Sequence, residues 1–248
     1  MARHIDRKQL KNPDQFVSFW TRVGSGLAAK RNIVLASVGG LLVLGLLIWG
    51  LVGWLGKRAA QASQDFARIE RIATADLLPA TPDAPKPSDD GLPHYKTEQE
   101  RLEAALKESQ SFLSSHSGSR LRAEAQLLEA RYLVALGKGS EAIAVYQELL
   151  GGTIDRRLRF LAAEGLGYAY EAAGQDDKAI AAFGALAEEA QGTGGFYRDR
   201  ALFSRARLLE KKGDRKEAEK LLKDILEKSP TTLLREEIND RLAALEGK

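Results

Sequence analysis

Residues 166–186 read LGYAYEAAGQDDKAIAAFGAL, and their regular order of small and large residues decides the fold. The same order recurs when the chain is aligned on Ala142, Ala179 and Ala218, which are 37 and 39 residues apart. Relative to each anchor, a small residue stands twelve positions before, a large one nine before, a glycine five before and a large one four after. The four sets are Ala130, Gly167 and Ala206; Leu133, Tyr170 and Leu209; Gly137, Gly174 and Gly213; and Tyr146, Phe183 and Leu222.

Each recurring position has a physical role in a pair of antiparallel helices. Small residues allow the two helices to approach closely, and the large residues fill the space between them. The glycine suits a helix end followed by a tight turn, because glycine adopts a positive φ at little cost. The large residue on the second helix is expected to fill the seam with the next hairpin.

This pattern resembles the tetratricopeptide repeat. Its L-G-x2-Y element is Leu166-Gly167-x2-Tyr170, and its A-x3-F element is Ala179-x3-Phe183. The first unit lacks a closing proline, whereas Pro230 closes the third, which carries Leu222 where an aromatic is usual. We therefore predict an all-α protein with three tetratricopeptide repeats over residues 119–230, forming an α-solenoid of antiparallel helix pairs. The simpler alternative is a set of generic helical hairpins.

Helical segments flank the three repeats. Apolar spacing predicts helices over 57–78 and 97–115, a leading region (56–118) that could form a degenerate hairpin. Between them, residues 79–95 hold five of the seven prolines and predict an extended loop. Residues 231–248 predict a C-terminal capping helix, because the last unit of a solenoid must cover its apolar face.

An uncharged apolar segment precedes the repeats. Residues 33–55, IVLASVGGLLVLGLLIWGLVGWL, are 23 residues without a charge. As a helix they extend about 34 Å, enough to cross a hydrocarbon core of about 30 Å. Trp49 and Trp54 lie toward one end, where indole rings favour the membrane interface. A buried core helix would not need so long an uncharged run, so we predict a transmembrane helix.

A cleaved signal peptide is the main alternative for this segment. AQA at 60–62 resembles a signal-peptidase site, but the apolar run is longer than the about 7–15 residues of a secretory h-region. Lys57 and Arg58 also lie between the run and that site. An uncleaved anchor is therefore preferred. The chain has no cysteine, which excludes a lipid-modified cysteine and a disulfide framework.

The basic tail predicts the orientation of the anchor. Residues 1–32 hold seven Lys or Arg against Asp6 and Asp14, a charge of +5, which leaves −2 for the rest of the chain. The positive-inside rule then predicts an inner (cytoplasmic) membrane protein with a cytoplasmic N-terminus and a repeat domain in the periplasm or its extracytoplasmic equivalent. Residues 11–27 predict a capped helix that either lies along the membrane surface or extends the span. The near-neutral remainder argues against nucleic-acid binding.

Motifs for catalysis are lacking in the sequence. His4, His94 and His116 share no helical face, which argues against a metal or catalytic cluster. No phosphate-binding loop, dinucleotide fingerprint or nucleophile elbow is found. We therefore predict a protein that is not an enzyme and uses no cofactor or metal.

Binding of proteins or extended polypeptide segments is the usual role of a repeat array, whose inner face is lined by the first helix of each hairpin. The repeats contain no asparagine, so the asparagine-containing carboxylate clamp of chaperone-tail receptors is not supported. A merely solvated helix face is the alternative for each position. The candidate groove residues are Glu124, Leu127, Arg131, Leu161, Glu164, Tyr168, Glu171, Arg200, Phe203, Arg207 and Glu210.

The order of the parts resembles the YfgM-type ancillary subunit of the SecYEG translocon: a short tail, one anchor, a split leading hairpin, three repeats and a closing REEINDRLAAL-type helix. The resemblance implies an adaptor beside the translocon that works with a periplasmic prolyl isomerase and passes emerging chains to chaperones. Two other hypotheses remain. One is a structural scaffold of a cell-envelope machine for secretion, motility or division, and the other is an enzyme or regulator with an unrecognised site.

Overall fold

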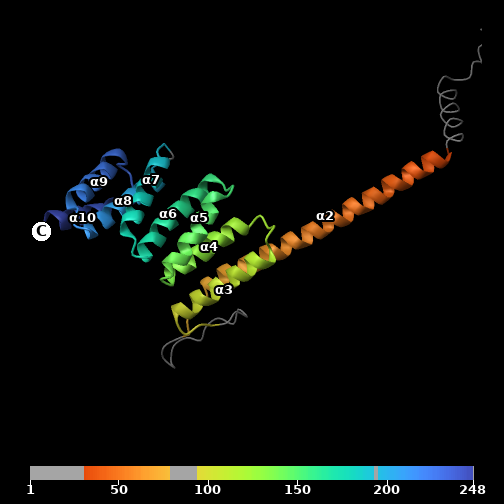
Figure 1. Ribbon diagram of the computed structural model, residues 1–248, viewed down its shortest axis with the longest axis horizontal. Coiled ribbons are helices and arrows are strands. Elements are labelled where there is room, and N and C mark those ends of the chain that lie inside the picture. Colours follow the sequence, from red (N-terminus) through yellow and green to blue (C-terminus); the bar gives the residue numbers. More distant parts are fainter. Residues whose placement is uncertain (1–30, 79–93, 193–194, 248) are drawn as a thin grey trace, which may run out of the picture. The chain divides into compact units, whose positions relative to one another are not determined.

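The computed structural model describes residues 31–78, 94–192 and 195–247. The expected helix over 11–27 and most of the proline-rich loop lie outside them. The described residues form nine α-helices and no β-strand, which confirms the all-α class (Figure 1). The chain divides into two units, residues 1–59 and 60–248. The helices are α2 (Arg31–Ala73), α3 (Glu98–Ser115), α4 (Arg122–Ala135), α5 (Gly139–Gly151), α6 (Arg156–Ala172), α7 (Asp176–Glu189), α8 (Phe196–Lys211), α9 (Arg215–Lys228) and α10 (Arg235–Glu246).

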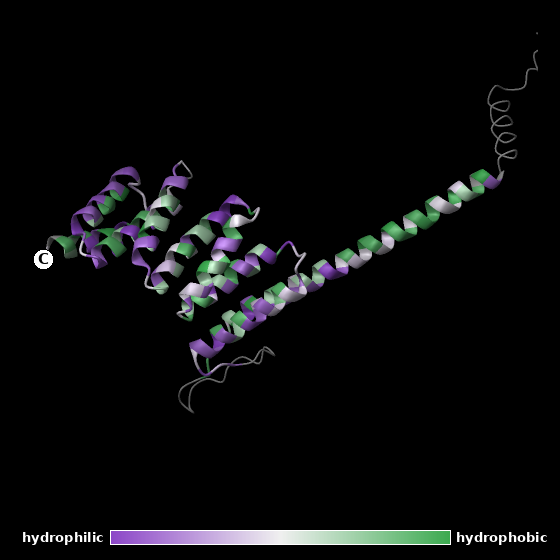
Figure 2. Ribbon diagram, in the orientation of Figure 1, coloured by the Kyte–Doolittle hydropathy of each residue, from purple (hydrophilic) through white to green (hydrophobic). Residues whose placement is uncertain are grey.

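The described part of the first unit is the apolar beginning of α2. Its described side chains from Ile33 to Ala59 are all exposed, and Figure 2 shows hydrophobic residues along this stretch. The helix is long and apolar enough to cross a membrane, as judged by length and composition. It continues without a break through Lys57 and Arg58, and the Arg58 guanidinium lies 4.6 Å from the centroid of the Trp54 ring.

The second unit begins with a hairpin between the end of α2 and α3. Phe66 and Phe112 pack edge to face with ring centroids 5.8 Å apart, and His116 Nε2 lies 2.8 Å from Asp65 Oδ2. The helix predicted over 57–78 ends earlier, at Ala73. Beyond Ala73 the backbone bonds to a distant part of the chain: the Leu78 N–H donates to the Tyr95 carbonyl at 2.8 Å.

Three hairpins follow, formed by α4 with α5, α6 with α7 and α8 with α9. Each hairpin turns at the predicted glycine: φ is +74° at Gly137, +71° at Gly174 and +90° at Gly213, which confirms the left-handed turn. In the middle turn the Gly174 N–H donates to the Glu171 carbonyl, and the Gln175 N–H donates to the Tyr170 carbonyl. These are the two hydrogen bonds of a Schellman motif. The other two turns repeat this pairing of bonds.

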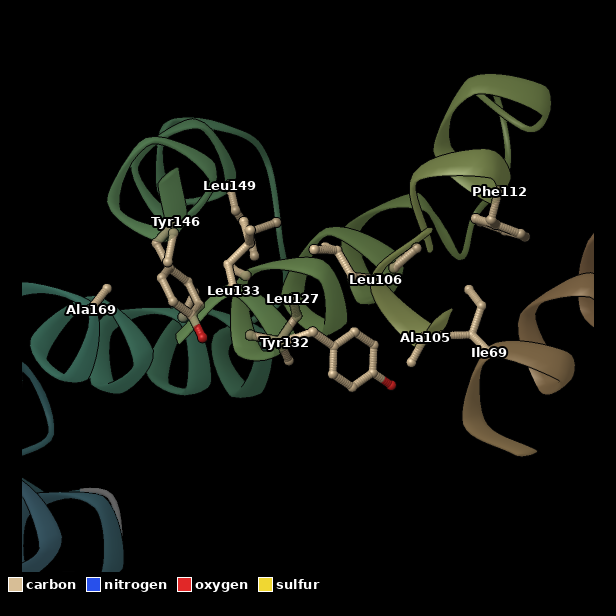
Figure 3. Packing of buried hydrophobic residues seen from close by; sticks show 14 of the residues in the cluster. Ile69, Ala105, Leu106, Phe112, Leu127, Tyr132, Leu133, Tyr146, Leu149 and Ala169 are labelled. Carbon is tan, nitrogen blue, oxygen red and sulfur yellow. The ribbon is translucent and has the colours of Figure 1, made fainter. Parts of the chain in front are cut away.

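Close packing within and between the hairpins explains the small residues of the repeat. A Cβ placed on Gly167 would lie 2.6 Å from ring carbons of Phe183, a fully buried side chain of α7. Tyr146 of α5 is also buried, and its ring fills the space over Gly165 of the next hairpin. Figure 3 shows Tyr146 pointing away from α5, close to Leu133 of α4.

The last helix closes the array. Ile238 of α10 is fully buried and belongs to the same apolar cluster as Leu222 and Ile225 of α9. The helix begins at Arg235, four residues later than the start of the predicted segment, and residues 229–234 form the connection from α9.

Candidate protein-binding groove

The eleven candidate groove residues lie on the first helices of the three hairpins. Those of α4 are Glu124, Leu127 and Arg131; those of α6 are Leu161, Glu164, Tyr168 and Glu171; those of α8 are Arg200, Phe203, Arg207 and Glu210. Of these, only Leu127 and Glu164 are buried by the remainder of the chain.

Several of the charged candidates pair with one another. Arg200 Nε donates to Glu164 Oε1 at 2.7 Å, and Arg207 binds both carboxylate oxygens of Glu171 at 2.6 and 2.5 Å. Both pairs join residues 36 positions apart, so they connect α6 to α8 at one register. Glu210 continues the series by accepting a hydrogen bond from Arg241 of α10. We call these three pairs the groove ion pairs.

The groove ion pairs perturb the arginines that form them. Partial burial would lower the pKa of Arg200, but the Glu164 carboxylate and Tyr168 together outweigh this effect and raise it. Hydrogen bonds to Glu171 raise the pKa of Arg207. Glu164 keeps only 5% of its surface exposed, so its charge is held under Arg200 and is not free for a ligand.

Two cavities open between these helices. The first, the α4–α6 cavity, has a volume of about 350 Å³. Its walls are largely apolar, and Arg131 is an exposed cation on its rim. It is lined by Leu127, Arg131, Val134, Ala135, Tyr146, Leu161, Glu164, Gly165, Tyr168 and Arg200.

The second cavity, the α8–α10 cavity, has a volume of about 680 Å³ and lies between α8 and the connection to α10. Two of its lining residues are large exposed apolar side chains, Phe196 (46% exposed) and Leu233 (82% exposed). Tyr168 and Arg200 line both cavities, so the two are neighbouring parts of one groove. The other lining residues are Gly195, Asp199, Phe203, Ser204 and Lys228–Leu234.

Seven of the eleven candidates line one or both cavities, whereas Glu124, Glu171, Arg207 and Glu210 line neither. Sequence reasoning missed Tyr146, Phe196 and the 228–234 connection. Tyr146 had a visible signal in the sequence, because it occupies the aromatic position four residues after Ala142. The first helix of the next hairpin also carries a glycine, Gly165, outside the recurring repeat positions. The sequence of residues 228–234 carried no such signal, because the position of this segment beside α8 depends on how α10 packs.

The described residues contain no cluster of three or more His, Cys, Asp or Glu side chains that could hold a metal ion. The polar side chains that line the two cavities are those of Arg131, Arg200, Tyr146, Tyr168, Glu164, Asp199, Lys228, Ser204, Ser229, Thr231 and Thr232. This chemistry suits the recognition of peptide backbone and side chains.

Comparison with known proteins supports the repeat assignment. A family model for the tetratricopeptide repeat matches residues 162–192 and 200–232. No curated protein matches the chain in sequence at a significant level. Since such repeats form protein-interaction scaffolds that are typically non-catalytic, the chain has the fold of a protein–protein interaction adaptor.

Solved structures with similar folds share little sequence with the chain. One holds nearly identical TPR-like repeats from Podosopora anserina, described as those of a kinesin light chain, with 19% identity and a TM-score of 0.47; the match covers 54% of this chain and 71% of that one. Another is a tetratricopeptide repeat protein from Parabacteroides merdae, also with 19% identity and a TM-score of 0.47. That match covers 60% of this chain and 56% of that one.

Proposed function

Because the chain carries tetratricopeptide repeats, we propose that it is a non-catalytic adaptor that binds extended polypeptides in the groove of its repeat array. The observation that carries this proposal is the pair of neighbouring cavities along α4, α6 and α8, which share Tyr168 and Arg200. An extended chain presents side chains at regular intervals, and two adjacent cavities can receive two of them.

The proposal places the adaptor at the inner membrane. The apolar beginning of α2 is its single-pass anchor, the basic tail stays in the cytoplasm, and the repeat array lies on the exported, periplasmic side. The charge of +5 over residues 1–32 supports this orientation through the positive-inside rule.

The layout of the chain further suggests the process that it serves. By its resemblance to the YfgM-type subunit, the adaptor sits beside the SecYEG translocon and acts with a periplasmic prolyl isomerase or chaperone. Its role is then to hold emerging polypeptides during the folding or assembly of secreted proteins. A scaffold of a secretion, motility or division machine is the alternative outcome of the experiment below.

In-cell photo-crosslinking tests the groove and the partners together. The crosslinking residue replaces Leu161 in the α4–α6 cavity or Phe203 in the α8–α10 cavity, and the matched control replaces Ala181, an exposed residue of α7. We expect translocon subunits, the isomerase and exported chains to be captured from the two groove positions and not from the control. Capture of machine components alone would support the scaffold, and identical capture at all three positions would refute binding in the groove.

A separate experiment tests the orientation. A reporter that is active only outside the cytoplasm, fused after Lys248, should be active, and a cytoplasmic reporter at the same place should not. Cytoplasmic activity would overturn the exported location and the translocon hypothesis together, while leaving peptide binding by the groove open to the crosslinking test.

A further inference from the structure

Arg131 differs from the other arginines of the groove. Arg200, Arg207 and Arg241 each bind a carboxylate of the chain through the groove ion pairs. No carboxylate of the described residues lies within ion-pair distance of Arg131, whose side chain is exposed at the α4–α6 cavity. This cavity therefore offers a positive charge that the protein itself does not neutralise.

Tyr146 lines the same cavity, with 1% of its surface exposed. The ring passes over Gly165 so closely that a Cβ there would lie 2.4 Å from the hydroxyl oxygen, so the hydroxyl lies against Gly165, another residue that lines the cavity. Burial raises the pKa of Tyr146, the charge of Arg131 opposes this rise, and the Glu164 carboxylate adds to it, so both charged groups are near the Tyr146 hydroxyl. The described residues provide no hydrogen-bond partner for this hydroxyl.

Donors therefore exceed acceptors in the α4–α6 cavity. Among its described lining residues Glu164 carries the carboxylate, and this group already accepts from Arg200. Arg131 and Tyr146 remain as donors between the apolar walls of Leu127 and Leu161. A carboxylate meets both donors with charge-assisted hydrogen bonds, which are stronger than neutral ones.

We propose that the α4–α6 cavity selects polypeptides by binding an aspartate or glutamate side chain between the Arg131 guanidinium and the Tyr146 hydroxyl. This inference rests on the proposed function, because it names the class of segment that the groove holds. A side chain within the segment is its ligand rather than a chain terminus, because the groove continues beyond this cavity into the next one.

The neighbouring α8–α10 cavity defines the rest of the motif. Its buried carboxylate, Asp199, accepts a hydrogen bond from Ser229 at 2.9 Å, so the polar floor is already satisfied. Phe196, Phe203 and Leu233 leave an apolar surface that fits a large aliphatic or aromatic side chain. The two cavities share Tyr168 and Arg200 and so are one helix spacing apart, about 8–10 Å, which an extended chain covers in about three residues.

Affinity selection from a peptide library tests this motif. The full-length protein in lipid nanodiscs is incubated with random dodecapeptides that are acetylated and amidated, so that neither end is charged. We expect the retained peptides to carry Asp or Glu about three residues from Leu, Phe or Met. The best peptide should bind about tenfold more tightly than its Asp→Asn analogue, as a charge-assisted hydrogen bond warrants.

Variants locate the source of the selectivity. Arg131→Gln should reduce the difference in affinity between the acidic peptide and its Asp→Asn analogue to less than about twofold, without weakening the binding of the analogue. Tyr146→Phe should reduce this difference partly. The matched control is Arg157→Gln, which removes another exposed arginine, on α6, that lines neither cavity. This control should leave the difference unchanged.

Three outcomes would overturn the inference. They are no preference for acidic peptides, a preference that survives Arg131→Gln, and tight binding of neutral peptides only when their C-terminus is left free. The last outcome would show recognition of a terminal carboxylate instead. None of them affects the crosslinking test, so groove binding can stand while its acidic selectivity falls.

Discussion

Replacing Gly167 with alanine should destabilise the repeat array, although alanine is the better helix former. Gly167 lies within α6, where alanine alone would gain about 1 kcal/mol over glycine. The added Cβ, however, would lie 2.6 Å from Phe183 ring carbons, about 1 Å closer than an ordinary carbon contact of about 3.5 Å. Phe183 is fully buried and cannot move freely, which places the overpacking cost in the upper part of the usual range of about 1–3 kcal/mol.

The net loss is therefore about 1–2 kcal/mol in the free energy of unfolding. Urea unfolding of the full-length chain in detergent, followed by circular dichroism at 222 nm, measures it. Gly151→Ala is the matched control, because Gly151 is a helical glycine with no atom near its absent side chain, and this change should be neutral or stabilising.

A double variant tests the stated cause. Phe183→Leu shortens the opposing side chain, so Gly167→Ala combined with Phe183→Leu should lose less stability than the sum of the single losses, by about 1 kcal/mol or more. A Gly167→Ala protein as stable as the Gly151→Ala control would refute the reasoning, as would strict additivity of the two substitutions.

Three further predictions concern stability. Gly213→Ala should cost about 1 kcal/mol in urea unfolding because φ is +90° there, and an unchanged midpoint would contradict the left-handed turn. Arg207→Gln should cost up to about 1 kcal/mol through loss of the Glu171 pair, and the loss should shrink in 1 M salt; a salt-independent loss would point to packing instead. Burial raises the pKa of Glu129, although the hydrogen bond from Gln110 lowers it in part. The Glu129 carboxylate therefore takes up a proton more readily in the folded state than in the unfolded state. Glu129→Gln should therefore stabilise the protein at pH 7, and this advantage should fade as pH falls through the carboxyl pKa; a constant difference across pH would contradict it.

The sequence was sufficient to predict the hairpins, because their determinants are local. Gly174 marks a turn that only a positive φ permits, and Gly167 with Phe183 records a contact between two helices of one hairpin. The turn glycine and the small and large packing positions recur at the same places in all three repeat units, so the three units together support the assignment more strongly than any one of them alone. Helix ends were less exact where the partner is distant, as at Ala73, where the backbone beyond the helix bonds to the chain around Tyr95.

The details of the groove could not be predicted in the same way. Register placed Glu164 and Arg200 on the inner face, but their pairing depends on the spacing of α6 and α8 and on side-chain rotamers. The α8–α10 cavity depends on the path of the chain between α9 and α10, which carries no repeat signal. The contribution of individual groove residues to binding remains a prediction.

The groove ion pairs also have a consequence for the speed of encounter. Each arginine in them is matched by a carboxylate, so these pairs add little to the long-range field of the inner face, where Arg131 is left to attract an acidic segment. Diffusional association of uncharged polypeptides should then proceed without electrostatic steering, at about 10⁵ to 10⁶ per molar per second, and should change little with ionic strength. Uncharged partners would then differ mainly in how long they stay bound.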